Sequence, residues 1–201
     1  MVRRNPRRHA LKIAIFVDGR QSDKQTIRIL AEKLLSNRSP RPGLEFLFLQ
    51  RGDFFSAAKV SAYLTNLRRR HHDVGKVILC LDCECTPAQE IRPQLTKVQE
   101  EVRLNHPSLN PTIVLKVHAL EGWLASDRKA VQKVLGAKPK AYPKPENECK
   151  PKALLARVFK KANKEFDYMR DDPRLAQEVD IESLCQSSPS FCEFRKAIED
   201  P

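Results

Sequence analysis

Two acidic residues stand one position apart at the end of an apolar run. The segment "VILCLDCEC" (77–85) opens with five apolar residues and then places Asp82 and Glu84 on either side of Cys83. A buried strand does not normally end in two like charges, because carboxylates that close repel each other and one is driven to hold a proton. A divalent cation removes this repulsion. Hard oxygen ligands without a nearby histidine favour Mg²⁺ or Mn²⁺ over Zn²⁺.

Two further acids stand at corresponding places in the chain. Asp18 ends the first apolar run, and Glu121 follows the last of the strand-like runs. If these runs are parallel strands, their carboxyl ends meet at the edge of the sheet where open α/β proteins carry their sites. Residues i and i+2 of a strand face the same side, so Asp82 and Glu84 can face a common point. We therefore expect all four acids to be catalytic groups and metal ligands, although each alone also fits a helix cap or a turn.

The elements that would position these acids alternate along the chain. Apolar runs typical of buried strands cover 11–19, 44–50, 76–82 and 112–118. Helices are expected over 22–37, 54–70, 87–104 and 120–136, the last ending at Gly136. Strands that are apolar nearly throughout, in alternation with helices, predict a parallel sheet that is covered on both faces. The predicted fold is therefore a three-layer α/β/α arrangement with a four-stranded parallel sheet.

The composition changes after residue 136. The segment "AKPKAYPKPENECKPK" (137–152) is rich in Pro and Lys, which predicts an irregular connection. Helical segments are expected to follow it over 151–166, 172–186 and 189–199. We assign residues 1–136 to the α/β domain and 137–201 to a connection and a helical appendage packed on it. A chain of 201 residues is long enough for one such domain.

The chain is strongly basic, with a net charge of +12 and a pI near 9.6. A basic surface favours a polyanionic partner, most often nucleic acid, although solubility or an anionic protein partner would also explain it. Candidate phosphate contacts are the clustered basic residues Arg3, Arg4, Arg7, Arg8, Arg68, Arg69, Arg70 and Lys152. The three at 68–70 would equally suit the dipole at a helix end, and Lys152 could instead pair with the acids.

The cysteine pattern favours a cytoplasmic protein. The six cysteines include a C-x-C at 83–85 and no zinc-knuckle spacing, so reduced thiols are a better interpretation than a structural zinc site. The basic start leads into a short apolar run that Lys12 interrupts, which does not fit a secretory signal. No run approaches the ~20 apolar residues of a membrane span, so no membrane contact is expected.

Four motifs in the chain carry a resemblance to a known family. The segments "VDGRQSD", "LDCE" and "LEGWLASD" look like a Toprim-type domain, the catalytic module of topoisomerases, primases and OLD-family nucleases. Together with "PENECKPKALL", they resemble more closely a prokaryotic Toprim-like family catalogued as domain of unknown function 4276. The matching positions are Asp18, Gly19, Asp23, Asp82, Glu84, Glu121, Trp123, Leu124, Asp127, Pro145, Glu146, Pro151, Lys152 and Leu155.

The resemblance implies metal-dependent phosphodiester chemistry, with Asp18 as general acid or base and Asp82 and Glu84 as ligands of Mg²⁺ or Mn²⁺. Asp18 is one methylene shorter than the family's Glu, and Glu84 one longer than its Asp. A metal displaced by about an ångström can cost ~100-fold in rate. The first hypothesis is a magnesium-dependent nuclease acting on DNA or RNA in a defence or repair system. The alternative is a catalytically weak module that binds nucleic acid, or a protein encoded nearby, within a larger complex.

Overall fold

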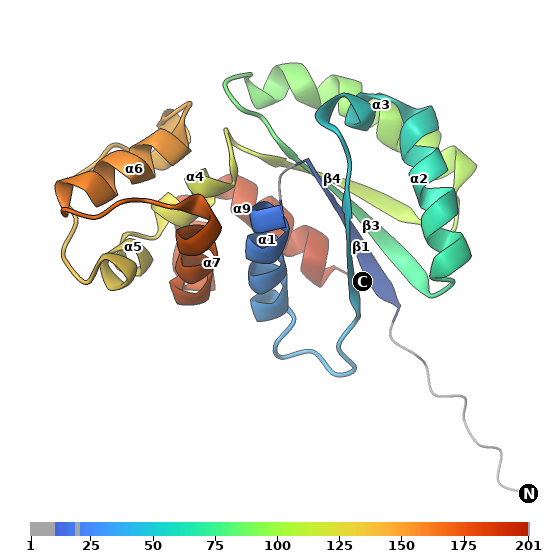
Figure 1. Ribbon diagram of the computed structural model, residues 1–201. Coiled ribbons are helices and arrows are strands. Elements are labelled where there is room, and N and C mark those ends of the chain that lie inside the picture. The colour runs from blue at the N-terminus through green and yellow to red at the C-terminus, as the bar shows by residue number, and fades with distance from the viewer. Residues whose placement is uncertain (1–10, 19–20, 201) are drawn as a thin grey trace, which may run out of the picture.

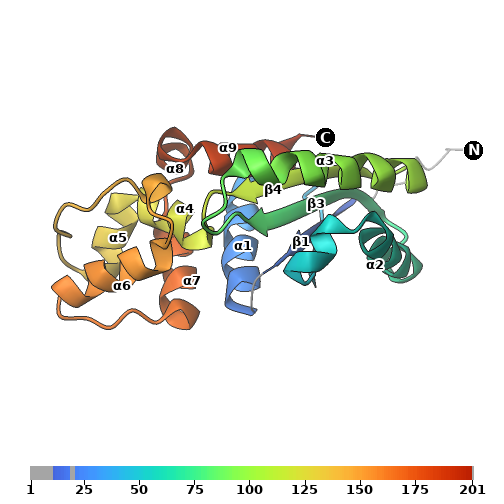
Figure 2. The same ribbon diagram turned by 90° about the horizontal axis from the view of Figure 1, so that it is seen from above.

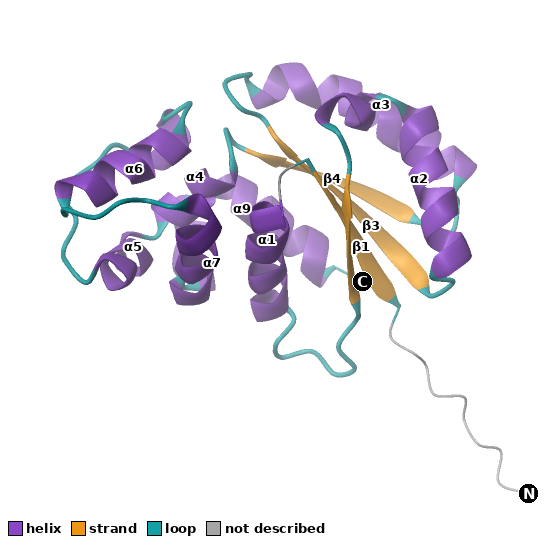
Figure 3. Cartoon of the chain, viewed as in Figure 1, coloured by secondary structure: helices purple, strands orange, loops and turns teal. Residues whose placement is uncertain are grey.

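Four parallel strands form one sheet in the order β2–β1–β3–β4, with helices on both of its faces (Figures 1 and 3). The computed structural model describes residues 11–18 and 21–200. The strands are β1 (Lys12–Val17), β2 (Leu44–Phe48), β3 (Val74–Asp82) and β4 (Asn110–Lys116). The helices are α1 (Gln21–Leu34), η1 (Arg51–Phe55), α2 (Ala57–Arg70), α3 (Ala88–Asn105), α4 (Leu120–Ser126), α5 (Arg128–Leu135), η2 (Pro145–Asn147), α6 (Pro151–Lys161), α7 (Tyr168–Glu178), α8 (Ile181–Ser187) and α9 (Pro189–Glu199). The predicted α/β fold with a four-stranded parallel sheet is confirmed.

The central strands β1 and β3 are largely buried because the sheet lies between two helical layers. All of β1 after its first residue is buried, as expected for a central strand that contacts helices on both faces. β3 pairs with β1 so that Cys80 lies beside Val17, and with β4 so that Lys116 lies beside Asp82. The strand ends that carry Asp18, Asp82 and Lys116 therefore meet at the carboxyl edge of the sheet.

Each face of the sheet has its own apolar core. On one face, η1, α2 and α3 cover side chains such as Phe16 and Leu79. On the other, α1, α9 and the helices from α4 to α8 form a second core with strand residues such as Ile15. Figure 2 shows α4, α5, α6 and α7 gathered beside α1. The helices that follow residue 136 therefore share a core with the sheet, while the division into two domains stays a prediction. Within the described residues, no helix is long and apolar enough to cross a membrane.

Two predicted helices are wrong, because each divides into two. The segment 120–136 forms α4 and α5, and the segment 172–186 lies across α7 and α8. Asp127 accepts hydrogen bonds through Oδ1 from two backbone N–H groups of α5, at 2.9 and 3.1 Å, and through Oδ2 from the backbone N–H of Asp180 at 2.8 Å. Asp180 in turn caps α8. Both breaks have the same kind of cause. At each break an aspartate, Asp127 or Asp180, accepts hydrogen bonds from the N–H groups that begin the next helix.

Two cysteines form a disulfide, which corrects the prediction of reduced thiols. Cys85 and Cys149 are joined across 64 residues, and their Cα atoms lie 4.9 Å apart. The free thiols are Cys80, Cys83, Cys185 and Cys192. The spacing along the chain gives no sign of this pair, because its members lie in two loops that only the fold brings together.

Candidate active site at the carboxyl edge of the sheet

Two of the predicted acids share a buried lysine. The Nζ of Lys116 lies 2.8 Å from Oδ1 of Asp82 and 3.3 Å from Oδ1 of Asp18. The backbone N–H of Asp82 also donates a hydrogen bond to Oδ2 of Asp18 at 3.0 Å. The structure therefore brings Asp18 and Asp82 together at the carboxyl edge of the sheet, as predicted, with an ammonium group shared between them.

Lys116 lies outside the set of residues predicted from the sequence. It is the last residue of β4, and its side chain is fully buried. Burial lowers the pKa of Lys116, but the charges of Asp82 and Asp18 outweigh burial and raise it, so the side chain stays charged. A signal was present in "TIVLKVH", because a lysine within an apolar parallel strand has to find a buried partner of opposite charge.

A second cation, Arg51, approaches the same acids from η1. Its Nη1 lies 3.6 Å from Oδ2 of Asp18 and donates a hydrogen bond to the backbone carbonyl of Asp82. Its Nε lies 4.0 Å from Oε2 of Glu84. The side chain is 32% exposed, so the guanidinium group reaches solvent. A planar guanidinium can hold a phosphate through two parallel hydrogen bonds, so Arg51 gives this edge a group suited to an anionic ligand.

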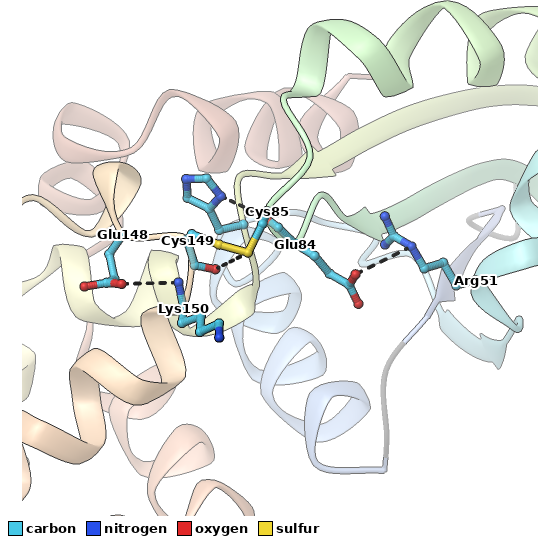
Figure 4. Close-up of a disulfide and its surroundings, with 7 residues drawn as sticks. Arg51, Glu84, Cys85, Glu148, Cys149 and Lys150 are labelled. Atoms are coloured by element: carbon cyan, nitrogen blue, oxygen red, sulfur yellow. Dashed lines mark hydrogen bonds and ion pairs between the residues drawn. A yellow bond between two sulfur atoms is a disulfide. The ribbon is translucent and has the colours of Figure 1, made fainter.

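Strand alternation does not extend to Glu84, which corrects the reason for expecting its side chain to face the same side as that of Asp82. β3 ends at Asp82, and Glu84 has a φ of 51°, so the alternation of the strand does not continue to it. Its backbone N–H donates to the carbonyl of His118 at 2.6 Å, and its own carbonyl lies 2.6 Å from Nδ1 of His118. The side chain is 67% exposed and points toward Arg51 (Figure 4). Glu84 therefore lies at the rim of the site.

Lys116 does not fully compensate the charge of Asp82. Burial raises the pKa of Asp82 to about 7, with Lys116 lowering it and the charge of Asp18 raising it. A carboxyl group with such a pKa takes up a proton near neutral pH unless another cation binds it. The side chain of Asp82 is 21% exposed, against 5% for Asp18. Asp82 is therefore the member of the pair that solvent or an ion can reach.

Glu121, the fourth predicted acid, lies in a neighbouring cluster. It is buried in the first turn of α4, and its charge raises the pKa of Asp82. Burial raises the pKa of Glu121, the charge of Lys152 lowers it, and the charge of Asp23 raises it. Lys152 also lies with its Nζ 3.2 Å from the centroid of the Tyr168 ring. The helices α1, α4 and α6 thus bring two acids and one lysine together beside the Asp18–Asp82 pair.

Asp172 on α7 completes this second cluster and was not predicted. The residue is fully buried, and neither carboxylate oxygen has a hydrogen-bond partner among the described residues. Burial first, and then the charges of Glu121 and Asp23, raise the pKa of Asp172 to about 9. At neutral pH Asp172 is therefore a neutral carboxylic acid. Its position in an appendage helix, far along the chain from the strand ends, gave no sequence signal for a place beside the site.

One family matches nearly the whole chain. The family model described as Domain of unknown function (DUF4276) matches residues 19–199. The chain belongs to this family. The family identification made from the motifs is thereby confirmed, while the relation of DUF4276 to Toprim domains stays a prediction. No curated protein and no solved structure matches the chain.

In this DUF4276 chain, two partly exposed carboxylates could bind a magnesium ion, but the described residues do not supply a complete set of protein ligands. Among the residues that the structure describes, no group of three or more His, Cys, Asp or Glu side chains is placed to hold a metal ion. Asp18 is nearly buried, and its oxygens already contact Lys116, Arg51 and a backbone N–H. Asp82 and Glu84 keep part of their surface exposed. Proteins commonly bind Mg²⁺ through one or two carboxylates together with substrate phosphates and water, and these two residues fit that mode.

The predicted phosphate-binding arginines of α2 lie at the opposite edge of the sheet. Arg70 ends α2 shortly before β3 begins, and Asp82 is the last of the nine residues of β3. At about 3.3 Å per residue, the strand separates them by roughly 30 Å. Arg68 and Arg69 precede Arg70 in the last turn of the same helix. The other predicted arginine contacts, Arg3, Arg4, Arg7 and Arg8, lie outside the described residues, whereas Lys152 lies on α6 in the second acidic cluster.

Proposed function

We propose that the chain is a magnesium-dependent phosphodiester-processing enzyme, and specifically a nuclease that acts on DNA or RNA at the carboxyl edge of the sheet. The observation that carries the proposal is the convergence of Asp18 and Asp82 on Lys116, with Arg51 beside them. This cluster combines an acid that lacks full charge compensation with a guanidinium group that can bind phosphate. The net charge of +12 would attract a polyanionic substrate toward it.

The role that we assign to each residue follows from its exposure and its contacts. Arg51 would bind and orient a phosphate group and stabilise the negative charge that develops on it in the transition state. Asp18 is a positioning residue, because it holds both Lys116 and the backbone of Asp82. Lys116 would keep the two aspartates in place by partly balancing their charge.

Asp82 and Glu84 would hold the magnesium ion together with the substrate. When bound, Mg²⁺ or Mn²⁺ would polarise a phosphoryl oxygen and balance the charge that Lys116 leaves on Asp82. The raised pKa of Asp82 supports this assignment, because it marks a buried acid that a further cation would relieve.

A second function, that of a binding module, is favoured by a separate observation. Lys116 contacts the carboxylates of both Asp18 and Asp82, and Arg51 contacts that of Asp18 and the backbone of Asp82, so the acids are held together without a metal ion. Such a module would bind nucleic acid, or a partner protein in a larger complex, without cleaving it.

Cleavage of labelled single- and double-stranded DNA and RNA with Mg²⁺ or Mn²⁺ tests the first function. Asp82→Asn should reduce cleavage by at least ~100-fold, because it removes the reachable ligand of the buried pair. The matched control is Asp73→Asn, which changes the same residue type just before the other end of β3 and should leave the rate unchanged.

The same measurements separate the two functions. Salt-sensitive binding without cleavage in any metal would support the binding module. Cleavage that survives in Asp82→Asn, or that persists after a chelator removes divalent ions, would contradict the proposed enzyme.

A further inference from the structure

A disulfide lies at the rim of the candidate site. Cys85 follows Glu84 in the loop after β3, and Cys149 lies shortly before α6. Figure 4 shows the bond between the Glu84–Arg51 pair on one side and Lys150 on the other. The bond therefore joins the acidic edge of the sheet to the Pro- and Lys-rich segment that leads into α6.

The two joined loops have separate supports apart from this bond. The loop after β3 is held to the end of β4 by the backbone pairing of Glu84 with His118 at 2.6 Å. The segment before α6 is held to that helix, where Oε2 of Glu148 accepts a hydrogen bond from Arg157 at 2.7 Å. Across the junction, the Sγ of Cys85 also lies 3.6 Å from the carbonyl oxygen of Cys149. Opening the disulfide would thus leave each loop attached to its own helix or strand but weaken the connection between them.

The disulfide lies at the surface of the molecule and not in its interior. Disulfides that stabilise folds are most frequent in small secreted domains without a sufficient core. This chain has two apolar cores, and the disulfide lies in neither of them. Cys85 is exposed and Cys149 is half-buried, so a thiolate in solution can approach the bond from the side of Cys85.

We propose that Cys85–Cys149 is a thiol-exchange site for a small-molecule thiol couple of the glutathione class, and that its redox state sets whether the loop after β3 is fixed to the segment before α6. A first thiolate attacks Sγ of Cys85, forms a mixed disulfide and releases the thiolate of Cys149. A second thiolate attacks the small-molecule sulfur of that mixed disulfide and releases Cys85. Two small-molecule thiols become one disulfide while the protein disulfide becomes two thiols, so electrons and protons balance.

The inference goes beyond the proposed function and does not depend on it, because its readout is the state of the two loops. Reduction should let residues 83–87 and 143–150 open independently of each other. Backbone amides in both segments should then exchange with deuterium at least about tenfold faster, since local opening becomes easier. Helix α2, on the other face of the sheet, should exchange at the same rate in both redox states.

The experiment equilibrates the full chain in buffers of different ratios of reduced to oxidised glutathione. Free thiols are then alkylated and the peptides are weighed by mass spectrometry, and hydrogen exchange is measured on parallel samples. Cys85 and Cys149 should change from protected to alkylated at the same ratio. Cys185 and Cys192, which are free thiols, should not show this joint transition.

Serine substitutions of the two cysteines test whether the bond itself holds the two loops together. Cys85→Ser and Cys149→Ser should each show the fast exchange of both loops without any reductant, and Cys192→Ser should retain the response of the unmodified chain. The proposal is overturned if Cys85 and Cys149 are alkylated at every glutathione ratio. It is also overturned if the oxidised pair forms but reduction leaves the exchange of both loops unchanged. Nuclease activity, present or absent, alters neither outcome.

Discussion

Asp171 and Asp172 are neighbours on α7 with opposite electrostatic environments. Asp171 accepts hydrogen bonds from Arg170 at 2.8 and 2.9 Å and from Arg174 at 3.2 Å. Burial opposes ionisation of Asp171, but the bonds from Arg170 and from the backbone N–H of Asp167 outweigh it and lower its pKa. Asp172 has no such partners among the described residues, and its pKa is raised to about 9 by burial first. One carboxylate should therefore stabilise the fold when ionised, and its neighbour should destabilise it.

Asp172→Asn should raise the free energy of unfolding at neutral pH. Between the unfolded pKa of about 3.9 and the folded pKa of about 9, the folded chain holds a proton on Asp172 that the unfolded chain releases. Stability therefore falls as pH rises through this window, and Asn removes that loss. The expected gain near pH 7 is at least ~1 kcal/mol, or roughly 2–4 °C in Tm. Urea unfolding at several pH values measures it.

Asp171→Asn is the matched control for that substitution. It should lower the free energy of unfolding by ~1–3 kcal/mol, because it removes the charge that Arg170 and Arg174 bind. If the stability of Asp172→Asn had the same pH dependence as that of the unmodified chain, the result would contradict the raised pKa of Asp172.

At the scale of elements, Asp127 connects two helices that the sequence does not show to be neighbours. Its carboxylate caps α5 and also accepts the backbone N–H of Asp180, the capping residue of α8. Asp127→Ala should therefore lower the free energy of unfolding by ~2–4 kcal/mol, because it leaves buried N–H groups in two elements without an acceptor. Denaturant unfolding checks the value.

Asp167→Ala gives a comparison for a cap that serves one element. Its carboxylate accepts the backbone N–H of Met169 at 2.9 Å in an exposed position. The expected cost is about 1 kcal/mol. Equal costs for the two substitutions would show that the bond to Asp180 contributes no stability.

At the scale of the whole molecule, positive charge gathers at the edge of the sheet opposite to the acids. Arg68, Arg69 and Arg70 at the end of α2 are exposed, and none of them forms an ion pair with a residue in the described ranges. If they bind phosphates, each contact should add about 0.9 to the slope of binding against salt concentration on a log scale. Changing all three to Ala should weaken nucleic-acid binding and flatten that slope.

These substitutions should leave the cleavage step at Asp82 unchanged, because the length of the strand separates the two edges by roughly 30 Å. A rise in the substrate concentration needed for half-maximal cleavage, with the same maximal rate, is expected. Arg92→Ala is the control, since Arg92 is already paired with Glu193 at 2.9 Å and should contribute little to the salt slope. A salt slope unaffected by the triple substitution would exclude this surface as the nucleic-acid contact.

The sequence by itself determined the strands and the edge of the sheet that carries the acids. An apolar run that is long enough for a strand but too short for a buried helix can satisfy its backbone N–H and C=O groups only by pairing in a sheet. The helices between successive runs require that this pairing be parallel. The carboxyl ends of such strands must then share one edge. For this reason the sequence alone predicts that Asp18 and Asp82 lie together.

The tertiary structure decided which groups surround that pair. Lys116 reaches Asp82 only through the register of β4 against β3, and Arg51 through the path of the chain after β2. Two further contacts join segments more than fifty residues apart, namely the hydrogen bond from Asp180 to Asp127 and the disulfide between Cys85 and Cys149. The burial of Asp172 likewise depends on the packing of α7 against other helices. Periodicity and spacing report on neighbours within a turn or a strand. Contacts between distant segments depend on how whole elements pack, and this packing set the charges around the candidate site.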